Sequence, residues 1–164
     1  MTRFQSLAGK CTALILPIVM LAGSANAQKA SKYACTEPDP ASLCNAGNTC
    51  GTASSPCVVD VKRTANLAAS TPVLPGAKGN MLFCVHPGTK ITWQSSSKNT
   101  GILVDAGDPS PFDPDGPIIG GSSAPKTVTA KKPGCYKYSA GACVSGAIYG
   151  MCKTVDAEFV IMPN

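Results

Sequence analysis

Short runs in which apolar and polar side chains alternate predict β-strands along most of this chain. The run "KITWQS" (90–95) places Ile91 and Trp93 on one face and polar side chains on the other, as in a half-buried strand. Other short strand-like runs occupy residues 58–63, 81–85, 101–105, 126–132, 135–139 and 157–162. No stretch repeats its apolar residues with the helical period of about 3.6. The pattern predicts an all-β fold of six or seven short strands with little helix.

Turn-forming residues separate these runs. Pro87-Gly88 and Pro133-Gly134 are turn signals, and the segment 106–125 is a long expected loop rich in Gly, Pro, Asp and Ser. Short strands with such frequent turns are typical of a β-sandwich.

The N-terminal segment differs from the rest and predicts a secretory signal. Arg3 and Lys10 precede the apolar run "TALILPIVMLAG" (12–23), and "SANA" ends in the small-residue pattern of a cleavage site. We therefore expect residues 1–27 to be removed by cleavage after Ala27. The apolar run is too short to span a bilayer. The product is expected to carry no membrane span and to be exported to the periplasm or the exterior of a bacterial cell.

Cysteine is the strongest compositional signal. Of the nine cysteines, one lies in the predicted signal; the others are Cys35, Cys44, Cys50, Cys57, Cys84, Cys135, Cys143 and Cys152. An even number in an exported chain predicts four disulfides, whose pairing the sequence leaves open. Half of these cysteines fall in residues 28–57, which hold few large apolar residues and so predict a cross-linked N-terminal extension. The main domain is then 58–164.

The charge pattern argues against nucleic acid as a partner. The chain has 14 Lys and Arg against 9 Asp and Glu, and Arg63 is the only arginine outside the signal. The lysines are scattered and form no basic face interleaved with aromatic side chains, which nucleic-acid binding favours.

Four segments together resemble one known family. They are "VHPGTKITWQS" (85–95), "GILVD" (101–105), "TVTAKKPGCYKYS" (127–139) and "DAEFVIM" (156–162), and their order and spacing are similar to the cupredoxins. The resemblance covers about residues 58–162. It implies a Greek-key β-sandwich of the plastocyanin and azurin type. In that family a blue-copper site uses two His, one Cys and a weak axial Met.

The copper ligands implied by the resemblance are missing from this chain. The first His position falls at Thr100, the Cys position near Ala140, the second His position near Cys143, and Met151 could stand for the axial Met. The chain's only histidine, His86, is expected at the far end of the 90–95 strand, out of reach. A chain with one imidazole cannot supply the two imidazole ligands of a blue-copper site. We therefore expect a metal-free binding or structural module without a cofactor, whose partner is an unidentified protein or a component of the cell envelope.

Two metal alternatives stay open. In the first, an atypical copper or electron-transfer site holds Cu(I) through Met151, Met162 or unpaired cysteines such as Cys143, since soft metals favour sulfur. In the second, carboxylates of the 105–117 loop hold calcium at low affinity. The candidates there are Asp105, Asp108, Asp113 and Asp115.

An enzyme or enzyme inhibitor is a third reading with little support. The sequence shows no Ser-His-acid order around His86, no GxSxG motif and no reactive-loop signature. We therefore expect no catalytic residues.

Overall fold

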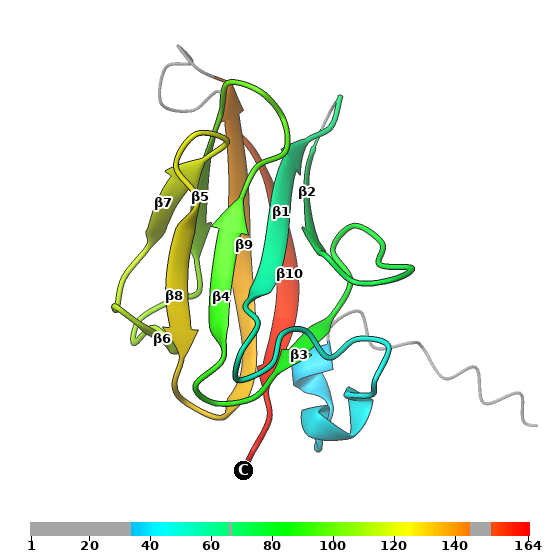
Figure 1. Ribbon diagram of the computed structural model, residues 1–164. Coiled ribbons are helices and arrows are strands. Elements are labelled where there is room, and N and C mark those ends of the chain that lie inside the picture. Colours follow the sequence, from blue (N-terminus) through cyan, green and yellow to red (C-terminus); the bar gives the residue numbers. More distant parts are fainter. Residues whose placement is uncertain (1–33, 66, 145–151) are drawn as a thin grey trace, which may run out of the picture. The chain divides into compact units, whose positions relative to one another are not determined.

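The computed structural model describes residues 34–65, 67–144 and 152–164, and these form ten β-strands in two five-stranded sheets with their connecting loops (Figure 1). The first sheet runs in the order β2 (Ala68–Pro72), β1 (Cys57–Arg63), β4 (Lys90–Gln94), β8 (Lys126–Ala130) and β6 (Phe112–Asp113). The second runs in the order β3 (Phe83–Val85), β10 (Lys153–Ile161), β9 (Gly134–Val144), β5 (Thr100–Asp105) and β7 (Ile118–Gly121). Two 3₁₀ turns, η1 (Ala34–Thr36) and η2 (Pro40–Leu43), precede the strands.

The chain moves repeatedly between the two sheets. It leaves the first sheet after β2 and enters the second at β3. Two neighbouring pairs are parallel, β1 with β4 and β3 with β10. All other neighbouring strands among these ten are antiparallel. For the residues that the structure describes, the predicted all-β fold and its scarcity of helix are confirmed.

An aromatic cluster fills the space between the sheets. Phe159 stacks on Phe83 and Phe112, with ring centroids 5.5 and 5.2 Å apart, and Trp93 meets Tyr138 edge to face at 5.3 Å. Each of these five rings is at most 3% exposed. Their burial is a main source of stability, because each large apolar side chain removed from water contributes roughly 1.5–3 kcal/mol. The prediction that Trp93 belongs to the core is confirmed.

Tyr138 joins the two sheets by its hydroxyl as well as its ring. Its Oη lies 2.8 Å from Oγ of Ser70 on β2, in a fully buried hydrogen bond. Burial raises the pKa of Tyr138 above its ordinary value, and the Ser70 hydrogen bond opposes this only in part.

This raised pKa predicts a loss of stability at alkaline pH. Below about pH 10 the folded and unfolded chains both keep this proton; above it, only the folded chain does, so the free energy of unfolding falls as pH rises. We expect Tyr138→Phe to remove about 1.4 kcal/mol per pH unit from that alkaline slope. Urea denaturation between pH 8 and about 11 measures it. An unchanged slope in the variant would show that Tyr138 ionises freely in the fold.

Four disulfides connect all eight predicted cysteines. They are Cys35–Cys135, Cys44–Cys84, Cys50–Cys57 and Cys143–Cys152. The first two tie η1 and the residue after η2 to β9 and β3, so two cysteines of the N-terminal segment reach the sandwich directly. Glu158 on β10 adds a polar contact, since its carboxylate accepts hydrogen bonds from the backbone N–H groups of Ala34 and Cys35.

The predicted boundary between extension and domain falls inside the fold. Cys57 opens β1 opposite Ile91, and Cys50 is 1% exposed within the core. The described residues from Ala34 onward belong to one compact unit, so the end of the Cys-rich segment is part of the sandwich.

Several strand bounds differ from the sequence-based prediction. β9 continues to Val144, five residues beyond the strand predicted at 135–139, and β6 and β7 lie inside the expected loop 106–125. β2 was missed because "AASTP" contains no large apolar residue; pairing with β1 makes it a strand. The signal prediction (1–27) lies outside the described residues.

Candidate functional site

The candidate site is the end of the sandwich where β4 leads into β5 and β7 leads into β8 (Figure 1, top of the view). We call it the hydroxyl-rich end and define it by residues 94–101, 120–124 and 143–144. Thr100 at the start of β5 pairs with Val144 at the end of β9, which brings the first and last of these segments together. In the cupredoxin alignment this is the end where copper is expected.

The positions aligned with copper ligands do not converge. Ala140 lies opposite Val104, four residues along β5 from Thr100, which corresponds to about 13 Å at 3.3 Å per residue. Ala140 is fully buried in the core, whereas Cys143 lies beside Gly101 on the opposite face of the sheet, since side chains alternate along a strand. The cause is the extra length of β9, which moves its end four residues beyond Ala140.

The sulfur atoms of the atypical copper alternative are also dispersed. Cys143 is bonded to Cys152, so its sulfur is not a thiolate in this structure. Met162 follows the far end of β10, where its N–H donates to Val85 at 2.9 Å. Cys152 precedes the near end of that nine-residue strand, about 30 Å away along the chain. Met151 lies outside the described residues.

His86 lies at the opposite end of the sandwich from Thr100, as the sequence predicts. It is exposed in the turn between β3 and β4, where its carbonyl accepts the Thr89 N–H at 3.1 Å. β4 separates this turn from the hydroxyl-rich end.

Three of the four aspartates proposed for calcium have other partners within the protein. Asp113 pairs with Lys131 at 3.0 Å, and Asp115 accepts the N–H groups of Ser110 and Gly116. Asp105 accepts the Gly107 N–H at 2.9 Å. Asp105, Asp108 and Asp115 line a cavity of about 500 Å³. Within residues 34–65, 67–144 and 152–164, no three His, Cys, Asp or Glu side chains are grouped so that they could ligate a metal ion.

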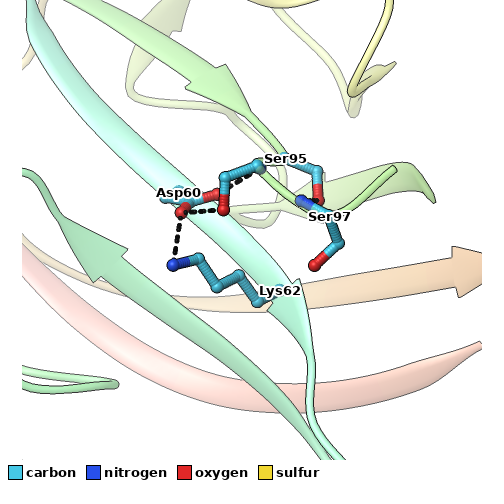
Figure 2. A network of polar contacts seen from close by, with 5 residues as sticks. Asp60, Lys62, Ser95 and Ser97 are labelled. Carbon is cyan, nitrogen blue, oxygen red and sulfur yellow. Dashed lines mark hydrogen bonds and ion pairs between the residues drawn. The ribbon is translucent and has the colours of Figure 1, made fainter. Parts of the chain in front are cut away.

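A polar network fixes the β4–β5 loop against β1 (Figure 2). Asp60, 7% exposed on β1, accepts the Ser96 N–H at 2.7 Å and the Ser96 hydroxyl at 2.8 Å. Lys62 completes the network with an ion pair to Asp60 at 3.0 Å, and the Ser97 N–H donates to the Ser95 hydroxyl. Because Val59 and Val61 face the core, Asp60 lies on the outer face of β1 and holds the loop there, although its own exposure is small.

Asp60→Asn is expected to lower the free energy of unfolding by about 1–3 kcal/mol, because a charged acceptor of two hydrogen bonds is lost. Lys62→Met should lower it by at most about 1 kcal/mol, since the lysine side chain is half exposed and such ion pairs are weak. Urea denaturation followed by Trp93 fluorescence measures both. Equal losses in the two variants would mean that the ion pair, not the Ser96 contacts, holds the loop.

Two clefts adjoin on the hydroxyl-rich end. One, of about 470 Å³, is lined by Gln94, Ser95, Ser96, Lys98, Asn99, Ser122 and Ser123. The other, of about 320 Å³, shares Asn99, Ser122 and Ser123 and extends over Thr100, three glycines, Cys143 and Val144. No sequence motif predicted this site. Its only signal was the small polar runs "SSSKNT" and "GGSSA", which are also what ordinary turns contain.

No protein-family model matches the chain, and no curated protein matches it with a significant score. No helix among the residues that the structure describes has the length and apolar character needed to cross a membrane.

Proposed function

We propose that this chain is an exported, disulfide-stabilised binding or structural protein of cupredoxin-like Greek-key fold that lacks a type 1 copper site. The strand order supports the family resemblance. The two strands that follow β1 belong to different sheets, β2 to the first and β3 to the second. The parallel pairs are β1 with β4 and β3 with β10. The Pro-Gly turn at 133–134 leads directly into β9, as the quoted motif implies.

The observation that carries the proposal is the chemistry of the end where copper is expected. Thr100 and Val144 face one another there, and the nearby Cys143 is bonded to Cys152 in a disulfide. The chain's single imidazole belongs to His86, at the other end of β4. A type 1 site needs two imidazoles and a thiolate, so this end is better suited to binding through polar groups.

Export is supported by two independent features. Residues 1–27 have the composition of a signal peptide, and four disulfides are typical of proteins that mature in an oxidising compartment. The proposed destination is the periplasm or the exterior of a bacterial cell.

The test is a metal and thiol analysis of the protein secreted from the full-length chain. We expect the mass of a chain that starts at Gln28, and no free thiol under denaturing, non-reducing conditions because all eight cysteines are in disulfides. We also expect no blue colour when Cu²⁺ is added and excess metal is dialysed away. One retained copper per chain with intense blue absorption would overturn the metal-free function. Free thiols that bind Cu(I) would favour the atypical copper protein instead.

A further inference from the structure

The clefts of the hydroxyl-rich end carry polar side chains that the fold does not use. Four of them, the side chains of Gln94, Lys98, Asn99 and Ser123, have no hydrogen-bond or ion-pair partner among the described residues. They offer two amides, a hydroxyl and an ammonium group on one surface. Polar groups of this kind can exchange water for the hydroxyls of a ligand with little loss.

The remaining polar groups hold this surface in place. The Ser122 N–H donates to the Thr100 carbonyl at 2.9 Å, and the Gly121 N–H donates to the Ala124 carbonyl at 3.0 Å. A Cβ at Gly121 would lie 2.5 Å from the Thr100 carbonyl oxygen, so only glycine permits this approach. The Asp60 network holds the β4–β5 loop, and the two backbone hydrogen bonds hold the β7–β8 loop. Both loops are therefore ordered before any ligand arrives, which reduces the entropy lost on binding.

The electrostatics of the clefts favour an anionic ligand. Lys98 is the only charged side chain among the described residues that line the clefts, and none of these residues carries a carboxylate. Asp60, behind the loop, is already engaged by Ser96 and Lys62. An anion placed here can form a charge-assisted hydrogen bond with Lys98 without facing a like charge from the lining.

The second cleft adds a weakly apolar surface. Gly101 leaves its position on β5 without a side chain, since a Cβ there would meet no atom closer than 3.9 Å, and Val144 in the same cleft is 44% exposed. A ring that presents C–H groups on one face and hydroxyls at its edge matches a surface of this composition. A small inorganic anion would reach Lys98 but would leave the amides and this weakly apolar surface unused.

We propose that the hydroxyl-rich end binds an acidic oligosaccharide, with a uronic-acid carboxylate on Lys98, ring hydroxyls on Asn99, Gln94 and Ser123, and a ring face against Gly101 and Val144. This inference rests on the proposed function, because it names the ligand class of the metal-free binding module. Asn99 has a backbone φ of 52°, which asparagine tolerates, and this conformation places it at the junction shared by the two clefts.

The test is calorimetric titration of the full exported protein, after its eight cysteines are shown to be blocked and its copper content to be nil. The probes are trigalacturonate, the neutral trisaccharide of galactose, and triglutamate, which has carboxylates but no sugar hydroxyls. We expect trigalacturonate to bind more tightly than either of the others, and its affinity to fall with added salt.

Three variants locate the site. Lys98→Gln should weaken trigalacturonate binding about tenfold, the size of one charge-assisted hydrogen bond. Asn99→Gly keeps the backbone conformation and should weaken it severalfold. Lys90→Gln removes the same charge at the other end of β4 and should change nothing.

Equal affinity for the neutral sugar, equal affinity for triglutamate, or equal loss in Lys98→Gln and Lys90→Gln would each overturn the proposal. So would the absence of trigalacturonate binding at millimolar concentration. Because the sample is first shown to be oxidised and copper-free, a negative titration refutes the ligand class while leaving the metal-free function intact. A copper-loaded sample would refute the proposed function first.

Discussion

Replacement of Cys35 and Cys135 by serine is expected to lower the free energy of unfolding by about 3–5 kcal/mol. This disulfide spans 100 residues, and it joins η1 to the start of β9. In the chain-entropy account, a cross-link over a longer loop restricts the unfolded chain more and so stabilises the fold more. Without the bond, η1 still has the hydrogen bonds from its backbone to the Glu158 carboxylate. Urea denaturation at neutral pH measures the loss, with Trp93, the only tryptophan, as a fluorescent reporter.

The matched control is the double serine variant of Cys143 and Cys152, whose loop is only nine residues long. We expect a loss smaller by about 2 kcal/mol, because the entropy term depends on the logarithm of loop length. A control variant that loses as much as the Cys35/Cys135 variant would show that loop length does not set the contribution of these disulfides. The four bonds would then act mainly through contacts in the folded state.

Phe159→Ala is expected to lower the free energy of unfolding by about 3–5 kcal/mol. Phe159 is fully buried on β10, and its ring contacts those of Phe83, Phe112, Tyr136 and Tyr138. Truncation removes apolar burial and leaves a cavity between the sheets that rigid neighbouring rings cannot close. The same denaturation measurement applies, since Trp93 remains in place to report on unfolding.

Two comparisons make this prediction specific. Phe159→Leu fills most of the space and should lose only about 1–2 kcal/mol. Ile119→Ala on β7 removes an apolar side chain that is 70% exposed, and should change stability by less than about 0.5 kcal/mol. A small effect of Phe159→Ala, close to that of Ile119→Ala, would mean that the aromatic cluster is not the centre of the folding core.

The candidate site could be anticipated only in part. The absence of a second imidazole can be read from the sequence alone, and so can the distance of His86 from Thr100, because β4 separates them. The clefts could not be found in this way, because Gln94–Asn99 and Ser122–Ser123 come from loops more than 20 residues apart. Serine, asparagine and glycine in loops are the usual residues of turns, so their sequence does not distinguish a binding surface from an ordinary turn.

The alternation around Ile91 and Trp93 determined which face of β4 is buried. The even number of cysteines outside the predicted signal indicated that disulfides would form. Those properties depend on residue type and local spacing. The tertiary structure decided the four pairings, the extension of β9 to Val144 and the meeting of the two polar loops. Each of these depends on contacts between residues far apart in the chain, such as Cys35 with Cys135, whose proximity exists only once both sheets have closed on their shared core.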